Sequence, residues 1–289
     1  MYIAGFLKLD FMSMQFNRGN IWRLLTSCGR LSSLAIAILA MCALASAAAR
    51  AGSSVTLAMS LTPLSAPVII AAEKGYFAAH GIDVGIKDYV GGMRTAKAMF
   101  EGKADMATSS EVVVMFNSFK RSDFSVICTF VTSDNDVKIV TRKDTGIRNV
   151  ADLAGMTVGT VTGASAQFFL DETLFLAGVD GAEVDVIHVN PEDSSTTLAS
   201  GKVDAVVIWE PLVYRIRRKL GDDAVLVPHS KIYTETFDLT VLKAFAKKHP
   251  DVLIGMVRAL IDSAEFIKAN KAEAQRIVAK RIDNALAGC

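Results

Sequence analysis

Two serines before a predicted helix are the first residues in this 289-residue sequence whose type and position suit binding chemistry. Ser109 and Ser110 follow a short apolar segment, and the pattern predicts a helix from about Glu111. Free backbone N–H groups and the positive end of a helix dipole favour an anion at such a position, and hydroxyl groups add donors without adding charge. The alternative is that Ser109 or Ser110 only caps the helix.

The segment TVTGAS, which ends at Ser165, has the same character. It places Thr162, Gly163, Ala164 and Ser165 between a predicted strand and a predicted helix. Gly163 allows a close approach of the backbone, and the small side chains leave room for a ligand. The segment lacks the Gly-Lys-Ser/Thr spacing of a P-loop, so it does not indicate a nucleotide site.

Three other residue pairs stand at predicted element boundaries and are candidates for the same site. They are Ser65 and Ala66 before a helix, Gly91 and Gly92 before another, and Trp209 and Glu210 after the apolar segment DAVVIW. A tryptophan at a strand end is suited to pack against an apolar or planar ligand, although it could instead belong to the core or to a lobe interface. We expect Glu210 to be a structural hydrogen-bond acceptor rather than a catalytic group.

Catalytic and metal chemistry find little support in the sequence. The four histidines are His80, His188, His229 and His249, and none of them pairs with another histidine or a cysteine at metal-ligand spacing. His188 alone ends a predicted strand near the candidate site. Cys128 lies in an apolar segment and is expected to be a buried structural thiol. We therefore predict no catalytic residue, no metal site and no cofactor.

The elements that must position these residues follow from alternating apolar and amphipathic segments, which predict βα units around largely parallel sheets. Gly-Lys-x-Asp occurs twice between a helical segment and a strand-like one, at Gly102 and at Gly201. A glycine there is suited to end the helix in the left-handed conformation. Ligands of open parallel sheets bind beyond the carboxyl ends of the strands, so the repeat predicts two similar halves around one crevice. The alternative is an accidental recurrence of a common turn.

Two helices are predicted with definite limits. Residues 66–79 form a single predicted helix that Gly81 stops. Pro250 begins a C-terminal helix in which apolar residues recur every three or four positions.

The N-terminal region predicts a signal peptide over 1–49, with Met14 as a possible start. Residues 34–49 are uncharged and follow Arg18, Arg23 and Arg30, and alanines with Ala-x-Ala spacing close the run. A membrane anchor is the alternative, but this run is shorter than the roughly 20 residues of a spanning helix. Lipid attachment at Cys42 is disfavoured, because Met41 is large for the position before a lipoprotein cysteine.

Export would leave a nearly neutral protein. Cleavage after residue 49 leaves 27 basic and 29 acidic side chains, a net charge of about −2. The sequence contains no run of five or more like charges. It therefore predicts no binding to nucleic acid or to anionic membranes.

Four segments together resemble the nitrate, sulfonate, taurine and thiamine-precursor group of solute-binding proteins of ABC importers. In chain order they are SLTPLSAPVIIAAEKGYFAAHGIDV, EGKADMATSSE, DLAGMTVGTVTGAS and SGKVDAVVIWEP. The resemblance extends over about 55–283. It implies an α/β fold of the type II periplasmic-binding-protein class, with two lobes of mixed, mostly parallel sheets joined by two crossover segments. Lobe one would comprise 53–135 and 236–289, and lobe two 136–235.

The same resemblance implies a periplasmic protein that captures a small anionic or sulfonate-like organic solute between its lobes. The crevice residues would be Ser65, Ala66, Gly91, Gly92, Ser109 and Ser110 from lobe one, and Thr162, Gly163, Ala164, Ser165, Trp209 and Glu210 from lobe two. Asp134 and Asn135 at one crossover, and 234–238 at the other, are hinge candidates rather than contacts. The partners would be the membrane permease and the ATPase of an ABC importer, with the protein itself a monomer.

The family pattern leaves one alternative and one departure. The alternative is a ligand-modifying enzyme of the thiamine-precursor type, although the cysteine-rich motif of those enzymes is missing from this sequence. The departure lies at the C-terminus, where family members usually continue with helical sequence beyond the position of Asn284. The segments VIWEP and TGAS look closest to the sulfonate branch.

Overall fold

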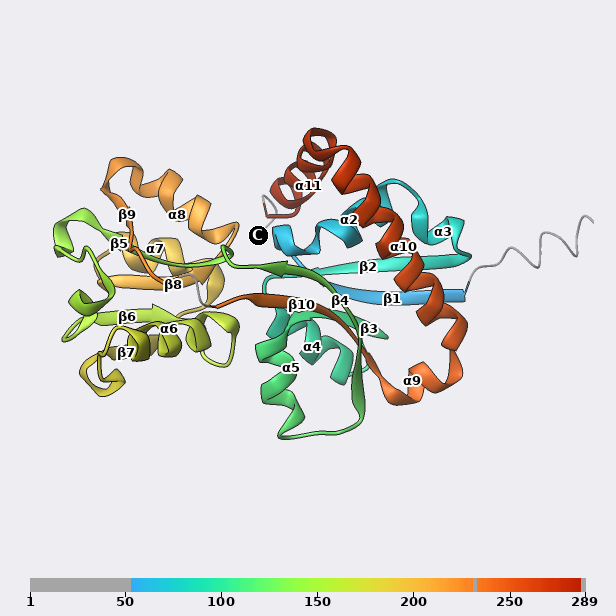
Figure 1. Cartoon of the computed structure of the whole chain (residues 1–289), viewed down its shortest axis with the longest axis horizontal. Helices are drawn as coiled ribbons and strands as arrows, with labels where there is room; N and C mark the ends of the chain where they lie inside the picture. The colour runs from blue at the N-terminus through green and yellow to red at the C-terminus, as the bar shows by residue number, and fades with distance from the viewer. Residues whose placement is uncertain (1–52, 231–232, 287–289) are drawn as a thin grey trace, which may run out of the picture. The chain divides into compact units, whose positions relative to one another are not determined.

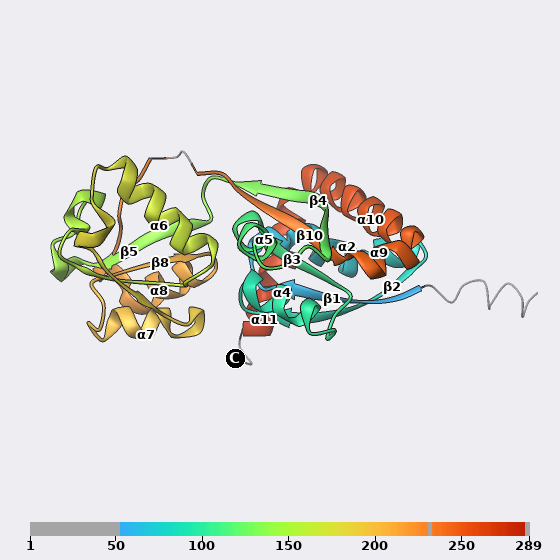
Figure 2. The ribbon, with the colours of Figure 1, turned by 90° about the horizontal axis from the view of Figure 1, so that it is seen from below.

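The computed structural model describes residues 53–230 and 233–286, which fold around two five-stranded sheets. Figures 1 and 2 show helices on both faces of each sheet. The predicted signal peptide over 1–49, with Met14 and Cys42, lies outside the described residues. Within the described ranges, every helix is too short or too polar to cross a lipid bilayer.

The first sheet has the strand order β2-β1-β3-β10-β4. Its strands are β1 (Ser53–Ser60), β2 (Ile82–Tyr89), β3 (Met106–Ser110), β4 (Phe124–Ser133) and β10 (Glu235–Leu242). The helices around it are α2 (Ala66–Glu73), α3 (Tyr76–Ala79), α4 (Gly92–Phe100), α5 (Glu111–Ser118), α9 (Lys243–Lys248), α10 (Pro250–Ala269) and α11 (Lys271–Leu286). Strand β10 is antiparallel to both of its neighbours, whereas β1, β2 and β3 are parallel.

The second sheet repeats this plan with the order β7-β6-β8-β5-β9. Its strands are β5 (Val137–Arg142), β6 (Thr157–Thr160), β7 (Asp185–His188), β8 (Ala205–Trp209) and β9 (Ala224–Leu226), and its helices are α6 (Ser165–Leu176), α7 (Ser194–Ala199) and α8 (Leu212–Leu220). Strand β5 is antiparallel to both neighbours, as β10 is in the first sheet. Each sheet therefore has one strand that runs against the other four.

The chain crosses between the sheets twice. Residues 134–136 connect β4 to β5, and 227–234 connect β9 to β10. These connections and the two mixed sheets confirm the predicted α/β architecture with two crossover segments. Every residue of β3 and of β8 is buried, as expected for central strands covered by helices on both faces.

The recurring Gly-Lys-x-Asp has the same structure in both sheets. Gly102 and Gly201 have φ of 71° and 75° and follow the ends of α4 and α7. The carboxylate of Asp105 accepts a hydrogen bond of 2.8 Å from the Thr56 amide in β1, and the Asp105 amide donates one of 2.8 Å back to the Thr56 carbonyl. Asp204 and Thr157 of β6 make the equivalent pair, at 2.9 and 2.8 Å. The repeat thus aligns the entering strand with its parallel neighbour.

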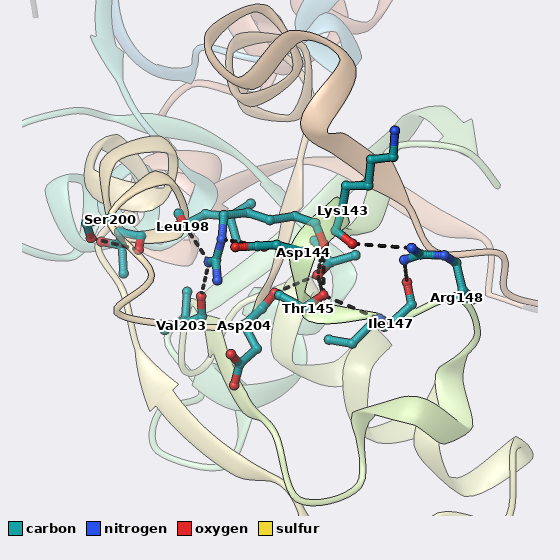
Figure 3. Close-up of polar contacts among 12 residues, drawn as sticks. Lys143, Asp144, Thr145, Ile147, Arg148, Leu198, Ser200, Val203 and Asp204 are labelled. Atoms are coloured by element: carbon teal, nitrogen blue, oxygen red, sulfur yellow. Dashed lines mark hydrogen bonds and ion pairs between the residues drawn. The ribbon is translucent and has the colours of Figure 1, made fainter.

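Arg142 stabilises the second copy of this turn. Its Nη1 donates hydrogen bonds of 2.8 Å to the carbonyl oxygens of Leu198 and Val203. Figure 3 shows these two carbonyl residues beside Asp204. A cation that binds the free carbonyls at a helix C-terminus also interacts favourably with the helix dipole. Arg142 therefore ties the end of α7 to β5.

The single helix predicted over 66–79 is wrong. The structure has two helices there, α2 and α3, because Gly75 between them takes a left-handed φ of 72°. Pro250 does begin a helix, α10, as predicted. The Lys74 ammonium lies 4.5 Å from the centre of the Phe266 ring in α10 and pairs with Glu273 in α11 at 2.5 Å. The break after α2 is thus accompanied by contacts to the C-terminal helices.

Gly159 in the middle of β6 offers a test of this packing. A Cβ atom added there would lie 2.7 Å from Val189 Cγ2 and 3.4 Å from Val203 Cγ1, and both are stiff β-branched side chains. We expect Gly159→Ala to lower the free energy of unfolding by about 1–3 kcal/mol, the usual cost of overpacking. Chemical denaturation would measure the change. Gly181→Ala is the matched control, since no atom lies within 4 Å of its added Cβ; equal stabilities of the two variants would contradict the packing.

Candidate functional site

A small cavity lies where the two sheets meet. It is lined by Ser60, Thr62, Leu64, Gly92, Ser110, Val113 and Phe237 from the first sheet and its connections, by Ala164, Ser165 and Trp209 from the second, and by Asp136 and Glu235, which lie where β5 and β10 begin. Its volume is about 20 Å³. That space holds roughly one water molecule, so a larger solute would require the sheets to move apart.

The position of the cavity follows from strand direction. Ser60, Ser110 and Trp209 are the last residues of β1, β3 and β8. Glu235 is the first residue of β10, and Asp136 immediately precedes β5. Because β10 and β5 run against their neighbours, they begin at the edge where the other strands end. The cavity is therefore formed at the carboxyl edges of both sheets, where ligands bind in open α/β folds.

Three helices begin beside the cavity. Gly92 is the first residue of α4, Ser110 precedes α5, and Ala164 precedes α6. The first N–H groups of a helix have no partner within the helix and carry its positive dipole end. The cavity wall therefore offers backbone donors to a polar or anionic group.

The hydroxyl groups of 108–110 have three different environments. Thr108 Oγ1 accepts a hydrogen bond of 3.0 Å from the Ser60 amide and so joins β3 to β1. Ser110 is the N-cap residue of α5, but its side chain makes no capping hydrogen bond. Ser109 Oγ is buried without a hydrogen-bond partner. Side-chain capping therefore does not explain either serine.

Five of the twelve predicted crevice residues line the cavity: Gly92, Ser110, Ala164, Ser165 and Trp209. The remaining seven lie elsewhere. Ser65 is fully buried and donates a hydrogen bond of 2.7 Å to the Ser60 carbonyl, which fixes the exit from β1. Ala66 lines a separate groove beside α11. Solute binding by any of the twelve stays a prediction.

Gly91 lies close to Trp209, although it does not line the cavity. A Cβ atom on Gly91 would lie 3.2 Å from Cζ2 of the Trp209 ring, and its φ of 93° disfavours other residues. Ser109 also lies close to these glycines, since a Cβ on Gly92 would be 3.0 Å from its Cα and Cβ atoms. The two glycines thus allow the loop before α4 to approach residues of both sheets.

The other predicted residues of the second sheet have local partners. The Thr162 amide donates a hydrogen bond of 3.2 Å to His188 Nδ1. The Gly163 amide donates one of 2.8 Å to Gln167 Oε1. Glu210 accepts a hydrogen bond of 3.1 Å from the Tyr214 amide and lies 3.4 Å from Lys138 Nζ. Glu210 thus has partners within the protein, and its function stays a prediction.

A surface ion pair also joins the two sides. Arg94 in α4 pairs with Glu192, which lies in the short 3-10 helix Pro191–Asp193, and its Nη2 donates to Oε2 at 3.0 Å. Such exposed pairs contribute about 0–1 kcal/mol. The pair therefore does not by itself hold the two halves together.

The sequence analysis missed the two carboxyl groups of the cavity, Asp136 and Glu235. Asp136 is 6% exposed and Glu235 only 3%. The two carboxyl groups interact with each other, and Glu235 also interacts with the Ser165 hydroxyl. Glu235 lay within a segment that was predicted to be only a hinge. Its position at the start of a strand that opposes its neighbours is the signal that identifies it.

Burial changes the proton affinity of both groups. It raises the pKa of Asp136 to about 7, against an opposing effect of Lys138 and with a further increase from Glu210. Burial raises the pKa of Glu235 well above its usual range, and the charge of Asp136 raises it further. Two neighbouring carboxyl groups in a dry site do not both ionise readily. The pair therefore retains a proton at a pH where exposed carboxyl groups have lost theirs.

Glu111 fixes the start of β10 and hence the position of Glu235. Its Oε1 accepts a hydrogen bond of 2.5 Å from the Tyr233 hydroxyl, and its Oε2 one of 2.8 Å from the Thr236 amide. Burial raises the pKa of Glu111, and these two hydrogen bonds act against the increase. Glu111 thus connects the first turn of α5 to the second crossover.

Within 53–230 and 233–286, no three histidine, cysteine, aspartate or glutamate side chains are grouped so as to hold a metal ion. Cys128 in β4 is half-buried with a free thiol, and burial raises its pKa to about 11. A thiol with so high a pKa is a poor nucleophile near neutral pH.

Comparison with known proteins finds a matching family and a relative that aligns with most of the chain. The profile of the family described as NMT1/THI5 like matches residues 62–274. A relative from Brucella abortus (strain 2308) is 24% identical over 221 residues. That relative is named as a binding protein. That alignment covers 75% of this chain and 68% of the relative.

Solved structures with the same fold include two binding proteins. The alkanesulfonate-binding protein SsuA from Xanthomonas axonopodis pv. citri bound to MOPS has a TM-score of 0.69 at 15% identity, covering 81% of this chain and 83% of that one. The periplasmic nitrate-binding protein NrtA from Synechocystis PCC 6803 has a TM-score of 0.67 at 17% identity, covering 80% and 66%. These likenesses confirm the predicted type II periplasmic-binding-protein fold.

The buried carboxyl pair predicts a pH dependence of stability. A carboxyl group with a higher pKa in the folded than in the unfolded protein binds more protons when folded, so the free energy of unfolding decreases as pH rises. For Asp136 this decrease extends from near 3.8 to about 7. We expect the melting temperature to fall between about pH 5 and pH 8, and to fall less in Glu235→Gln, where the amide cannot ionise.

Differential scanning calorimetry in low salt would measure this change. A loss of 1 kcal/mol corresponds to about 2–4 °C in a protein of this size. Asp123→Asn is the control, since a hydrogen bond from Arg121 lowers the pKa of this exposed carboxyl and moves its titration below the window. The same pH profile in wild type and Glu235→Gln would show that the pair does not retain a proton.

Proposed function

We propose that this chain, which belongs to the NMT1/THI5-like family, is the substrate-binding component of an ABC importer. The observation that carries the proposal is the cavity lined from both sheets at their carboxyl edges. We assign 53–135 and 236–289 to lobe one and 136–235 to lobe two. The protein would act as an exported, periplasmic monomer that captures a solute between the lobes and delivers it to a membrane permease and its ATPase.

Capture would proceed by movement of the lobes about the two crossovers. A cavity of about 20 Å³ is too small for an organic solute, so the solute must enter when the lobes are further apart. Hinge closure of this kind needs a few residues at element ends that absorb the change. The segments 134–136 and 227–234 are the residues through which such a movement must pass, because they are the connections between the sheets.

We propose that the solute carries a small anionic group, such as a sulfonate. The starts of α4, α5 and α6 supply backbone donors, and Ser110 and Ser165 supply hydroxyl groups. The names of the sulfonate-binding and nitrate-binding proteins that share the fold support this class. Trp209, which lines the cavity, favours an organic body over a bare inorganic anion.

An enzyme of the thiamine-precursor type on the same fold is the second candidate. It is favoured by the carboxyl pair of Asp136 and Glu235, because two carboxyl groups that share a proton are suited to acid–base chemistry. Mass spectrometry of each compound before and after incubation with the protein distinguishes the two candidates. Recovery of the bound compound unchanged supports transport, and its conversion supports the enzyme.

A thermal-shift experiment tests the binding function. Any compound that binds only the folded protein stabilises it, by about 2.7 kcal/mol at 100 times its Kd. We expect at least one member of a panel of sulfonates, nitrate and pyrimidines to raise the melting temperature by about 5–10 °C. No increase with any compound in a broad panel would contradict the proposal.

Trp209→Ala tests the contact between this ring and the solute. Trp209 is largely buried and lines the cavity, so its loss should weaken solute binding by about 1–3 kcal/mol, the value of one large apolar contact. Isothermal titration calorimetry would measure the affinity. Phe175→Ala removes a large ring of α6 that is 81% exposed and should leave binding unchanged. Unchanged affinity of Trp209→Ala would assign Trp209 to packing alone.

A further inference from the structure

We propose that the carboxyl pair of Asp136 and Glu235 binds a positively charged nitrogen of the solute, such as an ammonium or amidinium group. This inference rests on the proposed solute-binding function. It adds the requirement that the solute carries a positively charged nitrogen as well as an anionic group. It makes the two residues the determinants that select amine-bearing solutes over their amine-free analogues.

The hydrogen bonding of Glu235 is incomplete. Its Oε2 atom is buried and has no hydrogen-bond partner, while the residue is 3% exposed and lines the cavity. A buried polar atom without a partner costs free energy, and folded proteins rarely leave one in place without a reason. A donor that enters the cavity would supply the missing bond.

The residues that line the cavity favour a positively charged ligand. Its two ionisable residues are both acids, and no lysine or arginine is among the described residues that line it. Lys138 acts on Asp136, but its ammonium is engaged outside the cavity with the Asn135 carbonyl at 2.6 Å and with Glu210 at 3.4 Å. The wall formed by the pair is thus electrostatically suited to a cation.

Charged and polar groups of neighbouring elements also face the pair. Glu111 and Glu210 are acids whose charges raise the proton affinity of Glu235 and Asp136 respectively, whereas Lys138 and the Ser165 hydroxyl lower it. The neighbours therefore add negative charge more than they remove it. A ligand cation would relieve this repulsion, as the shared proton does in the free protein.

In the binding step, the ligand cation replaces the proton of the pair, so charge is conserved. In the free protein, burial and the mutual repulsion of Asp136 and Glu235 favour one proton held by the pair. Binding of R–NH₃⁺ moves that proton to solvent, and both carboxylates then accept N–H donors from the ligand. No covalent bond to carbon forms or breaks, and binding should release up to about one proton per ligand.

Matched pairs of compounds test the inference on the purified protein. The pairs are 2-aminoethanesulfonate with ethanesulfonate, and 3-aminopropanoate with propanoate, so that each pair differs only in the amine. Isothermal titration calorimetry in two buffers of different ionisation enthalpy gives both the Kd and the protons released. We expect the amine-bearing member to bind about tenfold more tightly or better, because hydrogen bonds between charged groups are strong, and to release protons.

Three variants separate the pair from general effects of burial. Glu235→Gln and Asp136→Asn should each reduce the preference for the amine by about tenfold and reduce the proton release. Asp238→Asn is the matched control, since Asp238 is an equally buried acid of β10 that bonds to Thr129 at 2.6 Å and does not line the cavity. It should leave the preference unchanged.

The outcomes distinguish this inference from the proposed function. Equal affinity for amine-bearing and amine-free members would overturn the inference and leave the binding function intact, and so would an unchanged preference in a folded Glu235→Gln. If no sulfonate, carboxylate, nitrate or pyrimidine binds, both are overturned. Unchanged melting temperatures of the variants near pH 5 would verify that they are folded.

Discussion

The burial of two carboxyl groups at the crossovers is the constraint on which the rest of the structure depends. Asp136 precedes β5 and Glu235 begins β10, the two strands that run against their sheets. Both side chains are consequently brought to the edge where the other strands end, and both are removed from water. Burying a carboxyl group is costly unless it is neutralised or hydrogen bonded, so the site exists only with a shared proton or a suitable ligand. The fold thereby places two buried carboxyl groups where the chain passes between the sheets.

The two sheets reach the same geometry by the same local device. In each, an aspartate at the start of a central strand binds the amide and the carbonyl of a threonine in the neighbouring strand, Thr56 in one case and Thr157 in the other. A left-handed glycine and a short turn come before it. This device fixes where the strand begins, and strand length then fixes where it ends. The last residues of the two strands, Ser110 and Trp209, therefore reach one cavity from opposite sides.

Much of this arrangement could be predicted from the sequence, because it depends on local signals. The alternation of segments gave the α/β class, and the repeated turn indicated two similar halves. Long-range packing decides the rest. No local pattern indicates that β10 and β5 run against their neighbours, and the sequence therefore does not identify Glu235 and Asp136 as residues of the cavity. Ser65 carries the same hydroxyl as Ser110, yet tertiary structure directs it to the Ser60 carbonyl. The left-handed Gly75 likewise divides what periodicity presents as one helix.

The space left by Gly91 has a consequence for the energetics of closure. The Trp209 ring from the second sheet lies against this residue, where even one added methyl group would be in close contact. Any larger side chain would act as a wedge between the halves. Residue 91 is thus a position where a substitution could alter the packing between the two halves without replacing a residue that lines the cavity.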